Sequence, residues 1–208
     1  MYSLLLLTLL SGAPAESLAV RSVEALPPPQ IAGTLGEPAL RFAGGRVAVW
    51  LVRAGDTVGL YVAIRDSTES PGDELVVSLD VAGDAAATPQ HDDFQWRLRR
   101  MLDSSVVSRG RGGRWAPPLD DPEWRLGAEH GGGGWEVEAA PTPDGWAVLL
   151  RLHPAWLAGE GGRRPAMAFR VYDGGPGGWY TWPPPRRGAH PTEVERAPSR
   201  WIPVGSGD

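Results

Sequence analysis

The sequence predicts an all-β fold, an antiparallel β-sandwich of about nine strands with an immunoglobulin-like or jelly-roll-like arrangement. Large aliphatic residues fall on alternate positions in Leu60–Asp66 and again in Leu75–Asp80, which is the period of strands with one apolar face. The chain contains 28 glycines and 21 prolines, as expected for many short strands joined by tight turns. No amphipathic helix longer than Pro154–Leu157 is evident. These features favour two packed sheets over a helical or mixed fold.

The expected strands follow one another between Val47 and Val204. The first, Val47–Arg53, is apolar on both faces and should be central in its sheet. A turn at Ala54–Thr57 leads into Leu60–Asp66, and the polar turn Ser67–Gly72 joins that strand to Leu75–Asp80 as a further pair. Six more strands are expected, the last two as a pair: Asp92–Leu98, Trp135–Ala139, Trp146–Leu152, Met167–Asp173, Trp179–Trp182 and Trp201–Val204.

The irregular stretches of the chain set its domain organisation. Residues 1–15 look like a secretory signal peptide, because Leu4–Leu10 is apolar and Ala13–Ala15 gives an A-x-A cleavage site. The other interpretation of Leu4–Leu10 is a buried N-terminal strand. Residues 16–30 contain three consecutive prolines and are expected to be a weakly packed linker. A single sandwich domain spans residues 31–204 and residues 205–208 form a tail. Ser108–Asp121, rich in Gly, Arg and Pro, is expected to be an excursion outside the core.

Composition and charge limit the compartment and the partners. The signal peptide predicts a secreted or periplasmic protein, and no other apolar run approaches the length of a transmembrane segment. The chain has no cysteine, so the core must hold the fold without disulfides. The formal net charge of −5 argues against a nucleic-acid partner, because binding to duplex phosphates requires a basic face. A monomer is expected.

Several segments, in order, resemble the family 9 carbohydrate-binding modules and the wider superfamily of sandwiches that share their fold. They are Ile31–Pro38, Leu60–Ala63 with Asp66, Asp73–Asp80, Asp92–Arg97 and Gly145–Leu157. The resemblance covers nearly all of the chain after the signal peptide. It implies a noncatalytic, secreted sugar-binding domain with structural calcium, a kind of domain often attached to hydrolases of plant polysaccharides.

The chain departs from this family at the sugar site. The family holds its sugar between two tryptophans, and the corresponding positions here fall at Glu69–Pro71 and around His190. Ala32 and Gly36 stand where the family's opening segment has aspartates. The resemblance therefore transfers the fold better than it transfers the ligand site.

The ten tryptophans are the first candidates for a sugar site, because sugars present apolar C–H faces that stack on indole rings. Most are expected in the core, including Trp50, Trp96, Trp135 and Trp146 on inward faces. The candidate ligand-binding residues are tryptophans in or beside loops and polar residues on the outward faces of strands. They are Trp115, Trp124, Trp179, Trp182, Gln95, Arg97 and Arg170.

Aspartates gather at the expected strand ends. Calcium prefers carboxylate and carbonyl oxygens from loops, so Asp66, Asp73, Asp80, Asp92 and Asp93 are candidate ligands for a structural calcium ion. The regular spacing of an EF-hand loop is absent. Ordinary turn aspartates are the alternative interpretation.

The expected function is noncatalytic binding of a polysaccharide or oligosaccharide, with a role in carbohydrate catabolism. We find no nucleophile motif, zinc spacing or phosphate-binding glycine loop, so an enzyme is not expected. Two alternatives remain open. One is a structural or docking sandwich without a sugar site. The other is a b-type haem electron-transfer domain, for which the chain offers these side-chain types: Met101, Met167, His91, His130, His153 and His190.

Overall fold

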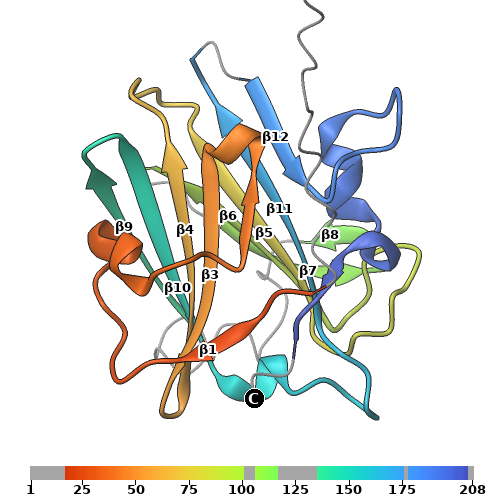
Figure 1. Ribbon diagram of the computed structural model, residues 1–208. Coiled ribbons are helices and arrows are strands. Elements are labelled where there is room, and N and C mark those ends of the chain that lie inside the picture. Colours follow the sequence, from red (N-terminus) through yellow and green to blue (C-terminus); the bar gives the residue numbers. More distant parts are fainter. Residues whose placement is uncertain (1–16, 101–105, 117–134, 176–177, 206–208) are drawn as a thin grey trace, which may run out of the picture.

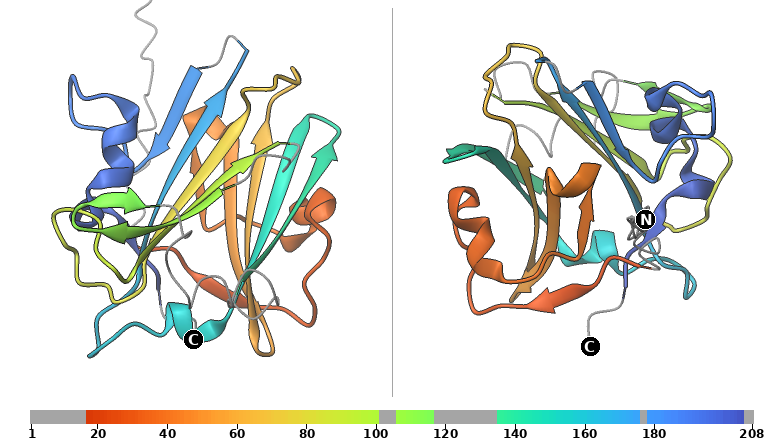
Figure 2. Two further views of the ribbon diagram at one scale, coloured as in Figure 1. Left: turned by 180° about the vertical axis from the view of Figure 1, so that it is seen from behind. Right: turned by 45° about the horizontal axis from the view of Figure 1, so that its top comes forward.

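The computed structural model describes residues 17–100, 106–116, 135–175 and 178–205. They form two β-sheets that face each other, as the tilted view in Figure 2 shows. The predicted all-β sandwich is confirmed. The first sheet contains β1 (Val20–Ser22), β2 (Leu40–Phe42), β3 (Val47–Ala54), β4 (Thr57–Arg65), β9 (Trp135–Thr142) and β10 (Gly145–Leu152). The second contains β5 (Glu74–Asp80), β6 (Asp93–Arg99), β7 (Val106–Arg111), β8 (Arg114–Ala116), β11 (Ala166–Asp173), β12 (Gly178–Trp182) and β13 (Ile202–Pro203).

The strand order places sequence-distant segments side by side (Figure 1). The first sheet runs β1-β3-β4-β10-β9, with β2 also paired to β3. The second runs β12-β11-β5-β6-β7-β8, with β13 also paired to β11. All of these pairs are antiparallel except β1 with β3.

Alternating apolar residues build the core between the sheets, as their period of two predicts. On β6, for example, Phe94, Trp96 and Leu98 join the core, while Arg97 on the opposite face is exposed. Residues from both sheets are enclosed almost completely, among them Leu60, Trp96, Trp146, Leu150 and Phe169. Trp50 is also buried, but it lies in a smaller cluster on the outer face of the first sheet.

Two predicted hairpins are present. The β3–β4 pair closes between Ala54 and Thr57, where Gly55 takes a positive φ of 56° that favours glycine. The β9–β10 pair closes between Thr142 and Gly145. A Cβ atom on Gly145 would lie 2.0 Å from the carbonyl oxygen of Ile64 on β4, so this position requires glycine.

The expected pairing of Leu60–Asp66 with Leu75–Asp80 is wrong. β4 lies between β3 and β10, whereas β5 lies in the other sheet between β11 and β6. The turn between them carries the chain from one sheet to the other, and strand alternation alone does not reveal this. The last two strands do not pair with each other either, because β12 and β13 both pair with β11.

Part of the stretch expected to be an excursion, Ser108–Asp121, belongs to a sheet. Its first residues lie in β7 and in β8, which form a hairpin at the edge of the second sheet. Val107 of β7 packs into the core. Residues 117–121 fall outside the described part of the chain.

The segment expected to be a weakly packed linker, residues 16–30, is packed where the structure describes it. Leu18 is fully buried in the main core, and β1 adds a parallel strand to β3. The hydroxyl of Tyr61 donates a 2.6 Å hydrogen bond to the carbonyl of Pro27, and burial raises the pKa of this tyrosine to about 12. Proline content therefore misled the interpretation of this segment, because its few apolar residues are anchors.

Short 3-10 helices cover the outer faces. η1 (Pro29–Leu35) lies over the first sheet, and η5 (Pro191–Arg196) and η6 (Pro198–Arg200) lie over the second. η2 (Ala43–Gly45) and η4 (Pro154–Leu157) connect strands. Within the described ranges, no helix has the length and apolar character needed to cross a membrane.

We predict that Leu18→Ala lowers the free energy of unfolding by about 2–5 kcal/mol, because it removes a fully enclosed side chain from the core. Chemical denaturation measures this loss. The control is Ile31→Ala, since Ile31 is 46% exposed and its truncation should change stability by less than about 0.5 kcal/mol. Equal, small effects of both substitutions would show that residues 17–30 are not part of the cooperative fold.

Candidate functional site

Polar and aromatic residues line two neighbouring rows on the outer face of the second sheet. Strand register places Trp179, Tyr172, Glu74 and Arg99 in one row across β12, β11, β5 and β6. The next row contains Thr181, Arg170, Val76 and Arg97. Because neighbouring strands are about 4.8 Å apart, each row spans about 14 Å of the sheet. Trp179 at one end of these rows and Arg97 at the other are exposed, while Arg170, Glu74 and Val76 between them are buried.

Arg170 is the centre of this surface and is only 3% exposed. Its Nη2 lies 2.9 Å from Glu74, and its Nε lies 2.6 Å from Glu195. Glu74 also forms ion pairs with Arg99 at 3.3 Å and with Arg97 at 3.7 Å. Removing a charge from water is costly unless it is paired, so the two carboxylates fix the position of the guanidinium.

Trp179 covers this buried guanidinium. The guanidinium carbon of Arg170 lies 4.5 Å from the centroid of the Trp179 ring, within the range of a cation–π interaction. Tyr172 contacts the indole from one side, with ring centroids 4.4 Å apart, and His190 meets it edge-on at 5.9 Å. Trp179 is nevertheless 39% exposed. It is therefore an aromatic platform that is held from several sides and still open to solvent.

Glu195 reaches the site from η5, which packing holds in place. The indole of Trp115 stacks on that of Trp201 at 6.2 Å, and its Nε1 donates to the carbonyl of Glu195 at 2.9 Å. Trp201 donates in turn to the carbonyl of Val194 at 2.7 Å. The second carboxylate oxygen of Glu195 accepts a 2.7 Å hydrogen bond from Gln95 on β6. The helix therefore links β6 to β11 through one carboxylate.

The structure brings four of the candidate ligand-binding residues together: Gln95, Arg97, Arg170 and Trp179. Gln95 and Arg170 are buried and bind the carboxylates of Glu195 and Glu74, while Arg97 and Trp179 reach the surface. Trp115 packs under η5, and Trp182 packs against the main core beside Phe42. Trp124 lies outside the described residues.

Sequence reasoning missed Glu74 and Glu195. Glu74 sits on the outward face of its strand, where a charged residue suggests solvent, and Glu195 lies in a short helix with no strand period. The signal available was the set of arginines on the outward faces of the neighbouring strands, Arg97 and Arg99 on β6 and Arg170 on β11, because guanidinium groups often pair with carboxylates.

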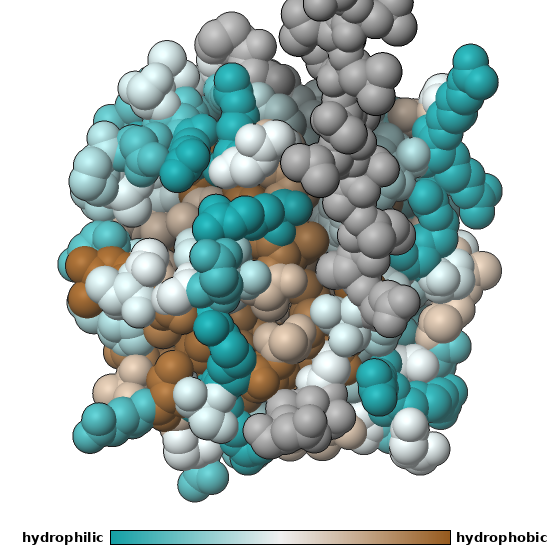
Figure 3. Space-filling model, viewed as in Figure 1, coloured by the Kyte–Doolittle hydropathy of each residue, from teal (hydrophilic) through white to brown (hydrophobic). Residues whose placement is uncertain are grey.

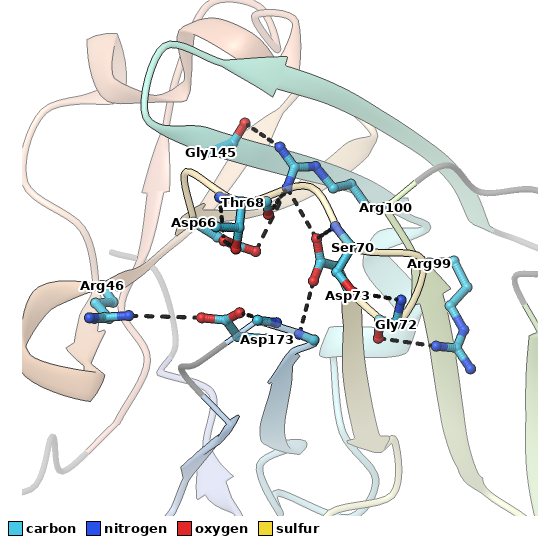
Figure 4. A network of polar contacts seen from close by, with 12 residues as sticks. Arg46, Asp66, Thr68, Ser70, Gly72, Asp73, Arg99, Arg100, Gly145 and Asp173 are labelled. Atoms are coloured by element: carbon cyan, nitrogen blue, oxygen red, sulfur yellow. Dashed lines mark hydrogen bonds and ion pairs between the residues drawn. The ribbon is translucent and has the colours of Figure 1, made fainter.

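The five candidate calcium ligands divide between opposite ends of β5. At one end, the carboxylates of Asp66 and Asp73 meet that of Asp173, and all three residues are buried (Figure 4). Arg100 enters this cluster: its Nη1 lies 2.9 Å from the carbonyl of Thr68, 3.1 Å from Asp73 and 3.7 Å from Asp66. Arg100 therefore pairs with two of the three carboxylates, those of Asp66 and Asp73.

A second arginine also compensates this first cluster. Arg46 lies 3.8 Å from Asp173. The carboxylates accept backbone hydrogen bonds as well, Asp73 from Ser70 and from Gly174. Two arginines thus compensate the Asp66–Asp73–Asp173 cluster, although Asp66 and Asp173 line a cavity and one oxygen of Asp66 has no hydrogen-bond partner among the described residues.

The other end of β5 has a different charge balance. The carboxylates of Asp80, Asp84 and Asp92 come together, and Asp93 lies directly across the ladder from Asp80. Asp80 accepts hydrogen bonds from two backbone amides of the following loop. Asp93 is fully buried, and one of its oxygens has no hydrogen-bond partner among the described residues.

The pKa values at this second cluster reflect crowded negative charge. Burial raises the pKa of Asp93 to about 8; a backbone hydrogen bond opposes the shift, and the charges of Asp80, Asp92 and Asp84 add to it. Burial also raises the pKa of Asp80, against two backbone hydrogen bonds. The Asp80–Asp84–Asp92–Asp93 cluster therefore offers oxygens that a bound cation would stabilise.

The residues of the haem alternative lie in different environments. Met167 is fully buried in the apolar core, whereas His91, His153 and His190 are exposed. Met101 and His130 lie outside the described residues. The described part of the structure therefore brings no methionine and histidine together in a shared pocket.

Comparisons with known proteins identify solved structures that have a similar fold. No family model matches the sequence, and no curated protein matches it. Solved structures do. A family 9 carbohydrate-binding module from Caldicellulosiruptor kristjanssonii in complex with cellotriose aligns with a TM-score of 0.56 at 13% identity, over 91% of this chain and 94% of that one. A structure of such a module from the same organism in complex with glucose aligns with a TM-score of 0.50 at 14% identity, over 78% and 77%. This chain shares the fold of those modules.

We predict that Glu195→Leu lowers the free energy of unfolding by about 3 kcal/mol, because it leaves a buried arginine with one carboxylate in place of two. Arg170→Met combined with Glu195→Leu should recover part of that loss, since apolar side chains then fill the same space.

Denaturant unfolding of both variants tests this, with Arg65→Ala as the control. Arg65 and Asp144 pair at 3.1 Å, but their side chains are 66% and 63% exposed. Arg65→Ala should therefore lower the free energy of unfolding by less than about 1 kcal/mol. An effect of Glu195→Leu no larger than that of the control would contradict the assigned role of Arg170.

Proposed function

We propose that this chain, which has the fold of family 9 carbohydrate-binding modules, is a noncatalytic domain that binds a polysaccharide or oligosaccharide on the outer face of its second sheet. The observation that carries the proposal is Trp179, a solvent-exposed indole fixed above the buried Arg170. Two modules of the same fold were solved with glucose and with cellotriose, which supports a sugar as the ligand.

Binding would combine stacking with hydrogen bonds. The C–H face of a sugar ring would lie on the exposed part of Trp179. Arg97, 48% exposed on the same sheet face, would donate to hydroxyl groups along the ligand. Because Glu74 and Glu195 already fix the guanidinium under the indole, the platform would lose little freedom when a sugar binds.

No catalytic step is part of the proposal. The two carboxylates at the site, Glu74 and Glu195, are both bound to Arg170, an arrangement that suits a rigid binding surface. Glu138, elsewhere on an exposed strand face, pairs with Arg151 at 2.6 Å. A noncatalytic role in carbohydrate catabolism, on a monomeric protein exported by the signal peptide at residues 1–15, completes the proposed function.

We further propose that the Asp80–Asp84–Asp92–Asp93 cluster holds a structural calcium ion. Calcium takes about six to eight oxygens at about 2.3–2.6 Å, so ligands on opposite sides of the ion lie up to about 5 Å apart. One oxygen from each of Asp80, Asp84 and Asp92 lies within 4.8 Å of the others. Asp93, directly across the ladder from Asp80, adds a buried carboxylate, and a cation within reach of its hydrogen-bond-free oxygen would satisfy that oxygen. The ion would tie the loop after β5 to the start of β6.

Calcium should raise the melting temperature of the chelator-treated protein, and calorimetry should find one site that Asp92→Asn weakens. The control is Asp66→Asn in the cluster that Arg100 and Arg46 compensate, which should leave the calcium titration unchanged. An identical melting curve in calcium and in chelator would remove the calcium proposal. So would a calcium titration that Asp66→Asn abolishes and Asp92→Asn does not.

Sugar binding is tested by calorimetric titration with glucose, cellotriose and a wider glycan screen. Trp179→Ala should weaken the binding at least about tenfold, because loss of the ring removes apolar contact worth more than about 1.4 kcal/mol. Trp179→Phe should retain much of it, since a smaller ring still stacks. Arg53→Gln, on the other sheet, should bind as the unchanged protein does.

If no glycan binds the unchanged protein, the alternative of a structural or docking sandwich without a sugar site takes the place of the proposal. If glycans bind equally well to Trp179→Ala, the site lies elsewhere on the molecule.

A further inference from the structure

The outer face of the first sheet carries a hollow that the sugar-binding proposal does not use. Strand register aligns Ala48, Ala63, Ala147 and Ala140 in one row across β3, β4, β10 and β9. The next row on the same face is large, with Trp50, Tyr61 and Leu149. Ala48 and Ala63 of the first row line a pocket of about 270 Å³ that ends against the indole of Trp50.

Two segments wall this alanine-floored pocket. η1 contributes Gln30 and Ala32 on one side, and the β9–β10 turn contributes Thr142 and Asp144. The indole N–H of Trp50 donates a hydrogen bond to the carbonyl of Gly36 and is therefore not available to a ligand. The alanines and the indole ring leave an apolar floor. Figure 3 shows this face of the molecule, where hydrophilic residues surround and cross an apolar central area.

Three arginines stand at the rim of the pocket. Arg41, Arg46 and Arg65 line it, against Asp144 as the single carboxylate of the lining. Arg65 pairs with Asp144 at 3.1 Å, while Arg41 meets the 91%-exposed Glu37 only at 3.8 Å. Arg41 and Arg65 thus each have one exposed carboxylate partner, which an incoming anion can displace because exposed ion pairs are weak.

Arg46 connects this rim to a neighbouring cavity of about 370 Å³, which is lined by Arg46, Arg65 and the carboxylates of Asp66, Asp144 and Asp173. Its guanidinium lies 3.1 Å from the hydroxyl of Tyr180 and 3.8 Å from Asp173, which orients it at the mouth of both spaces. About half of its side chain, 54%, remains exposed. The arginine therefore has surface left for a ligand.

We infer that the alanine-floored pocket is a second binding site, for a sugar acid of about one ring. A guanidinium pairs with a carboxylate through two parallel hydrogen bonds, which fixes the acid group at the arginine rim. Gln30 and Thr142 supply donors and acceptors for hydroxyl groups, and the alanines accept the C–H face of a small ring. The volume lies just below the usual range for drug-sized ligands, which limits the ligand to a small molecule.

The inference is independent of the proposed function, because the pocket lies on the opposite sheet from Trp179. Calorimetry of the Trp179→Ala variant with glucuronate at millimolar concentration tests it, with glucose as the ring without a charge and acetate as the charge without a ring. Glucuronate should bind more tightly than both. Trp179→Ala should bind glucuronate as the unchanged protein does.

Two kinds of variant locate the site. Arg41→Gln combined with Arg65→Gln should weaken glucuronate binding at least about tenfold, since each lost charge-assisted hydrogen bond is worth about 1.5–3 kcal/mol. Ala63→Ile should weaken it comparably without changing any charge, because the larger side chain fills the floor. Arg53→Gln, which removes an exposed arginine elsewhere on β3, is the matched control, and melting temperatures confirm that every variant folds.

Three results would overturn the inference. The first is the absence of glucuronate binding to the unchanged protein. The second is equal binding of acetate and glucuronate, which would mean that charge alone is recognised. The third is binding that Trp179→Ala abolishes or that Ala63→Ile leaves intact, which would place the anion outside this pocket.

Discussion

The buried guanidinium of Arg170 is the constraint on which the outer face of the second sheet depends. A charge taken out of water has to be paired, and here the partners come from two directions, Glu74 from the neighbouring strand and Glu195 from η5. η5 can supply its carboxylate only because Trp115 and Trp201 hold its backbone. Trp179 then closes the surface above the charge. One buried cation thus links the sheet, a helix and the exposed aromatic platform.

Much of the fold could be predicted from the sequence because strands have a period of two. Alternation correctly assigned the inward residues of β6 and identified the β3–β4 and β9–β10 hairpins. It could not tell which sheet a strand joins, and so β4 and β5 were wrongly paired. Their alternation is the same whether the turn between them folds back within one sheet or crosses to the other.

The candidate site was harder to predict than the fold. A charged residue on the outward face of a strand suggests solvent, yet Glu74 and Arg170 are buried because η5 and Trp179 cover them. Trp115 and Trp179 both follow glycine-rich stretches, and only packing separates them: the first stacks on Trp201, whereas the second remains 39% exposed. Burial of this kind depends on contacts between residues that are far apart in the chain.

The aspartates at the two ends of β5 show that the same residue type can have opposite roles. At the Asp66 end, Arg100 and Arg46 supply the positive charge from within the chain. At the Asp80 end, the neighbours that raise the pKa of Asp93 are other carboxylates. Sequence reasoning placed these aspartates correctly at strand ends, but only the positions of the arginines separate a cluster compensated by ion pairs from one crowded with carboxylates.

The central claim, that Trp179 is the aromatic platform of a sugar site, is tested most directly by following the tryptophan indole N–H signals by NMR during a cellotriose titration. The account predicts that the Trp179 signal shifts progressively to saturation, while those of the enclosed Trp96 and Trp146 stay in place. The account would be contradicted if the Trp179 signal never moved in titrations with cellotriose and with other sugars. It would also be contradicted if tryptophan signals from the opposite sheet moved in its place.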